Sequence, residues 1–410
     1  MFTVEQVGAA VLQHCAVREI IGLPLLQARG HVLAEVVHAD LDIPPFDNSA
    51  VDGYAVLAAD TQNASEVNPV PLRTLHEIPA GEMPTQPLVA CTAMRIMTGA
   101  VVPEGADAIV MIEQTRVEVP GTVSLFETAV KGDYIRRTGE DMRMGEVILQ
   151  PGREIGCAEI GVLATLGRVE VAVYRPARVA ILTTGDEVVD MVQDELPPPG
   201  KIRNSNRYAL QALVEEVGAE VVWVGHVPDS LEVTCKALQD CSRSGVDAIV
   251  CAGGVSVGDR DFVKPALERL GTLELWRVAM KPGKPLAFGK IDASLFFGLP
   301  GNPVSAMVTF ELFVRPALLQ MAGRKSERRE VLAQLLERIE HTPGRREYVR
   351  AVTTLEQSEF KTRTTGQQGS GRLRSMLEMD SLIVVPEERG DLYPGEHVTV
   401  RLLEKWLSPR

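Results

Sequence analysis

The chain has 410 residues, and its 42 Lys and Arg residues against 55 Asp and Glu residues give a formal net charge of −13 at pH 7. This acidity argues against nucleic acid or an anionic membrane as the main partner. Aromatic residues make up only 5% of the chain, so there is little surface on which bases can stack. Because a single hydrophobic core stops growing beyond about 250–300 residues, the length predicts several domains.

The first predicted element is an N-terminal helix. Thr3 and Gln6 have the spacing of a capping box in front of an amphipathic run. The segment lacks the basic and long apolar regions of a secretion signal, and nowhere do about 18 apolar residues run together. We therefore expect a cytoplasmic protein without a membrane span. The six cysteines include no C-x-x-C pair, so we expect reduced, mostly buried thiols.

Residues 46–144 are predicted to form a small β-rich domain, because this stretch is dense in Pro and Gly and contains several β-rich runs. Residues 1–45 and 145–175 flank it, and we expect them to form a helical and linking domain. In that domain, the strand-like run 168–174 is expected to return beside the N-terminal helix.

Residues 176–325 change to apolar strands separated by helices. This alternation predicts a doubly wound, mostly parallel α/β sheet covered on both faces. Such sheets bind ligands at the carboxyl ends of their strands, so the loops after ILTTG, VCAGG and FFGLPG are the places to search. In residues 326–410 strand-like runs return and predict a C-terminal β-barrel. The fold class is therefore α/β plus β, in several domains.

The strongest local signal is the strand DAIVCAGG, which runs into GVSVGDRDF. Gly253, Gly254 and Gly258 allow close approach of a ligand to the backbone, and Ser256 with neighbouring N–H groups can hold an oxyanion or a phosphate. A tight turn that needs glycine for its backbone angles is the alternative. The same letters match the nucleophile elbow of hydrolases, but the later histidines, His341 and His397, lie beyond the α/β segment that would supply a catalytic triad.

A second candidate site is the segment MKPGKPLAFGK, which places Lys281 and Lys284 in a loop stiffened by prolines. Two ammonium groups on such a loop suit a compact dianion, whereas solvated surface lysines are the alternative. The neighbouring FFGLPGNPVSA favours the site, because Pro300 and Pro303 lead into a helix N-terminus with Ser305 in its first turn.

Acidic residues also stand at the predicted strand and helix ends of the α/β domain. Glu187 follows ILTTG, Asp229 precedes a helix, and Asp261 precedes the next one. Helix caps explain Asp229 and Asp261 as well as magnesium ligation does. In the β-rich region, Asp52 and Thr98 lie in turn-like stretches that turn chemistry alone can explain.

Eight stretches occur in one order along the chain, and together they closely resemble the molybdopterin molybdenumtransferase family, which includes bacterial MoeA and the gephyrin E domain. They are FDNSAVDGYAV, RIMTGAVVPEGADAIVMIEQT, RRTGED, ILTTGDEV, GKIRNSNR, AGGVSVGDRDF, MKPGKPLAFGK and FFGLPGNPVSA. The resemblance implies an elongated homodimer that carries out the last step of molybdenum cofactor synthesis. In that step adenylylated molybdopterin and molybdate give the molybdenum-loaded cofactor and AMP, with Mg²⁺ as cofactor.

The resemblance also implies roles for individual residues. Glu187, Asp229 and Asp261 would supply carboxylate oxygens to Mg²⁺, and Lys281, Lys284 and Ser305 would hold molybdate. Family positions further correspond to Asp52, Thr98, Asp141, Pro300 and Pro303. The first three of these lie in the β-rich domain, so their role depends on a cleft between domains.

The predicted C-terminal domain contains TTGQQGSGRLRSM, which resembles the family's pterin-side loop. This resemblance makes Ser370, Arg372 and Arg346 candidate ligand contacts. Arg277 stands where some relatives have lysine, and it keeps the positive charge. The partners implied are the molybdopterin adenylyltransferase that supplies the substrate and the molybdoenzymes that receive the product.

Two other functions stay open at this point. Sibling domains that adenylylate molybdopterin share the GGVSVG-type loop, so adenylyl transfer is one alternative. An interaction scaffold is the other, because the gephyrin relative also organises partners.

Overall fold

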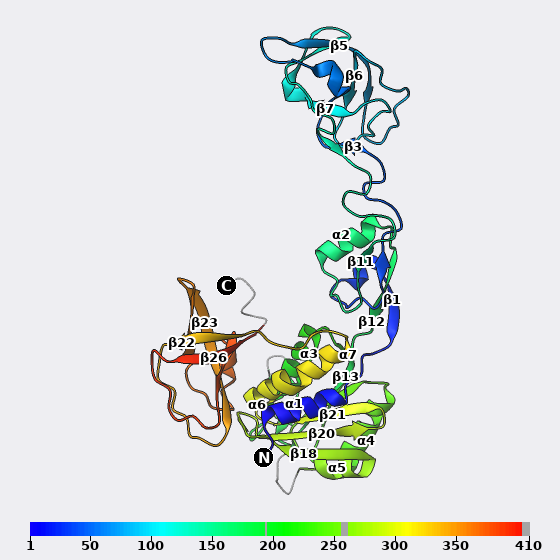
Figure 1. Cartoon of the computed structure of the whole chain (residues 1–410). Coiled ribbons are helices and arrows are strands. Elements are labelled where there is room, and N and C mark those ends of the chain that lie inside the picture. The colour runs from blue at the N-terminus through cyan, green and yellow to red at the C-terminus, as the bar shows by residue number, and fades with distance from the viewer. Residues whose placement is uncertain (193–194, 256–260, 404–410) are drawn as a thin grey trace. The chain divides into compact units, whose positions relative to one another are not determined.

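The structure is a computed structural model that describes residues 1–192, 195–255 and 261–403 (Figure 1). The chain divides into two compact units. The larger unit comprises Met1–Ala34, Glu154–Ile160 and Glu170–Arg410, and the smaller comprises Glu35–Arg153 and Gly161–Val169. Each unit is described separately below.

The smaller unit is built on a six-stranded sheet with the order β7-β4-β6-β5-β9-β8. Only β5 and β6 run parallel, and the other neighbours are antiparallel. Both faces are covered, because Tyr54 and Val56 of β4 belong to one apolar cluster and Ala55 belongs to another. The β-rich prediction for this region is confirmed. The strands are β4 (Gly53–Val56), β5 (Val70–Ile78), β6 (Thr92–Ile96), β7 (Ala108–Met111), β8 (Thr115–Val119) and β9 (Thr122–Leu125).

Short elements complete the smaller unit. They comprise two antiparallel strand pairs and two 3-10 turns. They are β2 (Val37–His38) with β11 (Val147–Leu149), β3 (Asn48–Ser49) with β10 (Ile135–Arg136), η2 (Ala58–Thr61) and η3 (Ile112–Gln114).

The α/β domain of the larger unit contains a six-stranded sheet with the order β16-β13-β17-β21-β20-β18. The strands β16, β13, β17 and β21 run parallel, as predicted. β20 is antiparallel to both of its neighbours, β21 and the edge strand β18. It runs against β21 because a two-residue turn at 292–293 joins the two strands directly and leaves no room for a crossover helix. The strands are β13 (Arg178–Thr184), β16 (Glu220–Val227), β17 (Ala248–Ala252), β18 (Gly271–Arg277), β20 (Pro285–Ile291) and β21 (Ser294–Leu299).

Helices cover both faces of this sheet, and Figure 1 shows the two layers. The helices α1, α3, α6 and α7 share one apolar cluster with the sheet, whereas α4 and α5 share the cluster on the opposite face. The central strand β17 is apolar along its whole length because both of its faces are buried. The helices are α1 (Val4–Gln13), α3 (Ser205–Glu216), α4 (Leu231–Arg243), α5 (Val263–Leu270), α6 (Pro303–Thr309), the π-helical turn η4 (Phe310–Val314) and α7 (Arg315–Met321).

The continuous helix Pro303–Met321 is long and apolar enough to cross a membrane. However, 78% of its most apolar window is buried inside the protein. It is therefore a core helix of the α/β domain, and its apolar character reflects burial on all sides.

The N-terminal helix α1 has the predicted capping box, in which the Thr3 hydroxyl accepts from the Gln6 amide and the Gln6 side chain accepts from the Thr3 amide. Its buried valines belong to the α/β core. The expectation that 168–174 returns beside this helix is wrong. Instead, β12 (Glu170–Tyr174) pairs antiparallel with β1 (Ile20–Pro24), because both strands offer matching extended backbone. The linking elements also include η1 (Leu25–Ala28) and α2 (Cys157–Thr165).

The C-terminal domain is a closed barrel in the part of the chain that the structure describes. Its five strands close in the order β23-β24-β22-β26-β25, with β25 returning to β23. The short strand β19 (Met280–Lys281) of the lysine loop adds in parallel to β23, so this loop joins the barrel to the α/β domain. The barrel elements are β22 (Glu330–Leu335), β23 (Arg346–Glu356), β24 (Glu359–Thr364), η5 (Leu373–Met376), β25 (Ser381–Val385) and β26 (His397–Leu402).

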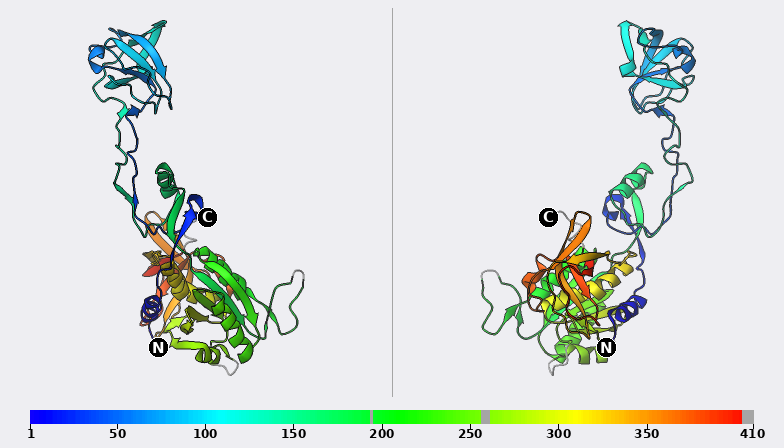
Figure 2. Two further views of the ribbon diagram at one scale, coloured as in Figure 1. Left: turned by 90° about the vertical axis from the view of Figure 1, so that its right-hand side faces the viewer. Right: turned by 60° about the vertical axis from the view of Figure 1, so that its left-hand side comes forward.

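An arm leaves the α/β sheet after β13 (Figure 2). Its two short strands, β14 (Val188–Val189) and β15 (Ile202–Arg203), run parallel to each other. The arm returns the chain to Asn204, which caps α3 by accepting from the Arg207 amide at 3.1 Å.

Candidate active site

A cavity of about 590 Å³ opens at the carboxyl ends of β13, β17 and β21. From β13 the chain passes outward to β16 and then returns to β17 on the other side, so the cavity lies at the point where the strand order reverses. The loops after ILTTG, VCAGG and FFGLPG all line it, as predicted. The first turn of α3 supplies another wall through Asn204, Ser205 and Asn206.

Gly253 and Gly254 form one wall of the cavity with φ angles of +98° and +65°. A Cβ atom on Gly253 would lie 2.8 Å from the Thr184 hydroxyl and 2.9 Å from the Thr184 carbonyl oxygen. The turn therefore needs glycine for its backbone angles and for space, and the same turn exposes backbone to the cavity. Ser256 and Gly258 lie outside the described residues, so the nucleophile-elbow interpretation has no geometry to support it.

Three predicted acidic residues, Glu187, Asp229 and Asp261, line this same cavity. The Asp229 amide donates to Asp186 Oδ1 at 3.1 Å, and the Asp186 amide lies 3.4 Å from Asp229 Oδ2. The N-cap position of α4 is Ser230, so the capping explanation for Asp229 is wrong. Asp229 instead joins the loops that follow β13 and β16.

The fit of these carboxylates to Mg²⁺ follows from their grouping. Among the described residues, no group of three or more His, Cys, Asp or Glu side chains is close enough to hold a metal on its own. Mg²⁺ in phosphate-handling sites usually keeps several waters and takes one or two carboxylates together with substrate phosphates. One or two of the three carboxylates that line the cavity fit that partial set of ligands, and in the described part of the chain they do not form an all-protein cage.

The turn Pro300–Pro303 and the start of α6 continue the lining next to Gly253, whose amide donates to the Leu299 carbonyl at 3.1 Å. Pro300, Pro303 and Ser305 all line the cavity, and Ser305 is otherwise buried. The Val304 amide in the first turn of α6 lies 3.3 Å from the carbonyl oxygen of Ser370. The predicted pterin-side loop of the barrel thus reaches this end of the cavity through Ser370.

The lysine loop contributes backbone rather than charge to the cavity wall. Gly283 and Pro285 line the cavity, whereas neither Lys281 nor Lys284 is among its described lining residues. Lys281 is ion-paired with Glu347 of the barrel at 2.9 Å. Lys284 and Arg277 are exposed. Lys281 is thus close in sequence to residues that line the cavity, but its side chain binds Glu347 instead.

The arginines of the barrel have different environments. Arg346 pairs with Glu387 at 3.1 Å and with Glu5 of α1. Burial lowers the pKa of Arg346, but its hydrogen bond to Glu5 and its interactions with Tyr348 together outweigh this effect and hold the pKa above its usual range. These partners give Arg346 a structural role in joining α1 to the barrel. Arg372 lines a separate cavity of about 340 Å³.

Arg350 was missed by the sequence prediction. It is fully buried in β23, and burial lowers its pKa to about 10. Its Nε donates to the Ser375 hydroxyl at 2.8 Å, and Nη1 has no hydrogen-bond partner among the described residues. The side chain thus supports the loop that carries Ser370. The available signal was a charged residue inside the otherwise apolar strand YVRAV.

Asn206 and Thr184 were also missed as cavity residues. Both line the cavity, and the Asn206 amide donates to the Gly301 carbonyl at 2.7 Å. This bond joins the start of α3 to the turn before α6. The stretch GKIRNSNR contains Asn206, but a helix cap at this stretch was enough to explain its asparagines without a role in the cavity.

The predicted residues of the β-rich domain belong to the smaller unit. Asp52 Oδ1 accepts from both the hydroxyl and the amide of Thr98, each at 2.7 Å. These bonds, the hydroxyl first, hold the pKa of Asp52 below its usual range. Asp141 is exposed, and its amide donates to the Ile43 carbonyl at 3.0 Å. Asp52 and Thr98 are thus brought together, and Asp141 has a separate environment.

Comparison with known proteins agrees with this architecture. Residues 2–167 match the family model "MoeA N-terminal region (domain I and II)", residues 180–320 match "Probable molybdopterin binding domain", and residues 333–403 match "MoeA C-terminal region (domain IV)". The fold and its cavity thus define a protein built on an α/β domain of the molybdopterin-binding class.

Similarity to whole proteins is equally extensive. A molybdopterin molybdenumtransferase of Haemophilus influenzae is 36% identical over 92% of each chain. A gephyrin of Dictyostelium discoideum is 34% identical over 98% of this chain and 62% of its own length. The crystal structure of the molybdopterin biosynthesis protein MoeA from Pyrococcus horikoshii superposes with a TM-score of 0.83 at 30% identity and covers 98% of this chain. The chain belongs to the MoeA family of molybdopterin molybdenumtransferases.

Proposed function

We propose that this chain is a molybdopterin molybdenumtransferase, which inserts molybdate into adenylylated molybdopterin and releases AMP. The observation that carries the proposal is the cavity at the strand ends, where a glycine turn, three carboxylates and a helix start meet in a chain similar to enzymes of that name. The anionic substrate does not conflict with the overall charge of −13, because local fields in a cleft govern the binding of a small anion.

Each wall has a distinct task under this proposal. The backbone at Gly253 and Gly254 can approach the phosphates closely, and Ser305 in the first turn of α6 can donate to an oxyanion through its hydroxyl. Glu187, Asp229 and Asp261 would hold Mg²⁺, which when bound neutralises charge on a phosphoanhydride and its leaving group. Release of AMP requires cleavage of that anhydride, so carboxylates and a phosphate-binding turn in one cavity suit the reaction.

The proposal extends to the assembly and location of the protein. We propose a cytoplasmic homodimer that receives its substrate from the adenylyltransferase and passes its product to molybdoenzymes. Asp52, Thr98 and Asp141 would act in this reaction from the β-rich domain. The high coverage of whole relatives supports a role for the β-rich domain in the same reaction.

The direct test is AMP release from adenylylated molybdopterin by the purified chain with molybdate and MgCl₂. We expect AMP to appear only when molybdate and Mg²⁺ are both present, and EDTA to stop its release. No AMP release, with the Haemophilus influenzae relative active in parallel, would overturn the proposal. Consumption of ATP with free molybdopterin would instead favour the adenylyltransferase alternative.

A pair of variants locates the reaction in the cavity. Asp261→Ala should lower AMP release by about a hundredfold or more, because one of the carboxylates proposed to hold the charge-neutralising Mg²⁺ is removed. Glu268→Ala, on the exposed face of the adjacent α5, should leave the rate unchanged. Both variants should unfold at the temperature of the wild type. Wild-type activity in Asp261→Ala would mean that the site lies elsewhere.

A further inference from the structure

Thr184 is the last residue of β13 and lines the cavity at the strand ends, although it is only 8% exposed. Its neighbour Thr183 also lines the cavity, but the Thr183 hydroxyl accepts from the Asn204 side-chain amide at 2.8 Å and lies 3.1 Å from His226 Nδ1. In the part of the chain that the structure describes, the Thr184 hydroxyl has no hydrogen-bond partner. A buried hydroxyl without an internal partner normally bonds to water or to a ligand.

The Thr184 hydroxyl lies against the glycine turn of the cavity. A Cβ atom would be 2.8 Å from Thr184 Oγ1 if it stood on Gly253, and 3.1 Å from it if it stood on Gly254. Both distances are too tight for an ordinary Cβ contact, so the two glycines leave the space that the hydroxyl occupies. The hydroxyl therefore stands where backbone can approach a phosphate most closely.

Phosphate oxygens bound at this turn need hydrogen-bond donors beside it. The Gly253 amide already donates to the Leu299 carbonyl at 3.1 Å. The Asn206 side-chain amide, which reaches the neighbouring Gly301, donates to its carbonyl at 2.7 Å. These two donors are engaged within the protein, whereas the Thr184 hydroxyl can still donate one hydrogen bond.

We propose that Thr184 is a further catalytic residue, whose hydroxyl donates to a non-bridging oxygen of the substrate's phosphoanhydride. Negative charge builds up on these oxygens as AMP leaves, and a donor fixed in a buried site stabilises that charge without having to reorient. The hydroxyl keeps its proton and forms no bond to phosphorus. The inference rests on the proposed function, because that function supplies the phosphoanhydride.

The test replaces Thr184 by valine, which removes the hydroxyl and keeps the β-branched shape. A hydrogen bond to a charged group corresponds to about a tenfold to hundredfold effect, so kcat for AMP release should fall by that factor. The Kd of AMP, measured by titration calorimetry with MgCl₂ present, should rise about tenfold. The KM for molybdate should change by less than about twofold, and Thr184→Ser should recover most of both losses. If Thr184→Val does not fold, Thr184→Ala gives the same comparison.

Thr234→Val is the matched control. Thr234 is buried in α4 of the same domain, its hydroxyl donates to the Ser230 carbonyl at 2.8 Å, and it is not among the described residues that line the cavity. This variant should change neither constant.

Two results would overturn the inference. One is wild-type kcat and wild-type AMP affinity in a folded variant that lacks the Thr184 hydroxyl. The other is a Thr184→Ser variant as impaired as Thr184→Val, because shape rather than the hydroxyl would then matter. If the wild type releases no AMP from the adenylylated substrate but binds AMP, and Thr184→Val weakens that binding, the inference stands and the proposed function fails. A wild type that neither releases nor binds AMP would remove both.

Discussion

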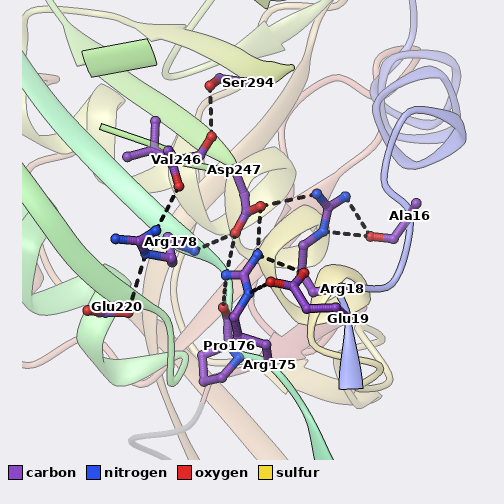
Figure 3. Close-up of polar contacts among 11 residues, drawn as sticks. Ala16, Arg18, Glu19, Arg175, Pro176, Arg178, Glu220, Val246, Asp247 and Ser294 are labelled. Atoms are coloured by element: carbon purple, nitrogen blue, oxygen red, sulfur yellow. Dashed lines mark hydrogen bonds and ion pairs between the residues drawn. The ribbon is translucent and has the colours of Figure 1, made fainter. Parts of the chain in front are cut away.

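The guanidinium of Arg175 and the carboxylate of Asp247 form a bidentate pair, with Nη1 2.9 Å from Oδ2 and Nη2 3.1 Å from Oδ1 (Figure 3). Asp247 also accepts from Arg18 Nη1 at 3.1 Å and from the Arg178 amide at 2.7 Å. Arg18 lies after α1, Arg175 follows β12, and Arg178 is the first residue of β13. A single carboxylate before β17 thus binds two separate segments of the larger unit, the stretch after α1 and the stretch between β12 and β13.

We expect Asp247→Ala to lower the free energy of unfolding of the larger unit by about 3 kcal/mol. The loss would leave two arginines without their shared carboxylate in a mostly buried place, where the Arg175 and Asp247 side chains are 18% and 9% exposed. The hydrogen bond to Asp247 is also the main reason why the pKa of Arg175 is raised. Urea denaturation followed by intrinsic fluorescence measures the effect.

The control for this prediction is Glu220→Ala. Glu220 is 60% exposed and lies 3.7 Å from Arg178, so its removal should cost less than about 1 kcal/mol. If Asp247→Ala and Glu220→Ala lowered the free energy of unfolding equally, the Asp247 cluster would contribute no more to stability than an exposed ion pair.

Gly253→Ala should destabilise the α/β domain by about 1–3 kcal/mol and abolish AMP release, because φ of +98° is strained for alanine and its Cβ meets Thr184. Gly301→Ala, in the same cavity, would place its Cβ 3.8 Å from Gly253 Cα, an ordinary contact. It should change stability by about 0.5 kcal/mol or less. Thermal unfolding of the two variants shows whether the need for glycine is confined to Gly253, where φ is positive and a Cβ has no space, or extends to Gly301 as well.

Iodoacetamide at about pH 8 should label Cys91 and Cys157, which are exposed, and spare Cys15, Cys241 and Cys251, which are buried. Burial raises the pKa of Cys15 and of Cys241 to about 12, and it raises that of Cys251 as well, so little reactive thiolate forms. Peptide mapping by mass spectrometry gives the pattern. In guanidinium chloride all six cysteines should react, and rapid labelling of Cys251 in the native protein would contradict the buried core.

Thr98→Val should raise the pKa of Asp52, because the Thr98 hydroxyl is the first of the bonds that hold it below its usual range. Since the folded-state pKa is depressed, the stabilising contribution of this bond is present above the ordinary pKa and is lost as pH falls through the depressed value. Carboxyl ¹³C NMR of labelled aspartate measures the titration. Thr138→Val, which removes a hydroxyl from Asp47 instead, should leave the Asp52 titration unchanged.

Local features of the fold were predictable because short stretches of sequence encode them. The capping box at Thr3 and Gln6, the apolar strands around Val250 and the left-handed turn at Gly253 each depend on a few neighbouring residues. The carboxyl-end cavity followed from the alternation of strands and helices. The antiparallel edge of the sheet was not predicted, because strand direction depends on the turn at Asp292 and on packing.

The sequence by itself determined the fold class, the family and the loops that meet in the cavity, since these rest on periodicity and on motifs of a few residues. The tertiary structure alone decided that Lys281 binds Glu347 rather than lining the cavity, that Arg346 is held by Glu5, and that Arg350 lies buried beneath the Ser370 loop. Each of these pairings joins residues far apart in the chain. Their partners are set by strand register and burial, which no local pattern specifies.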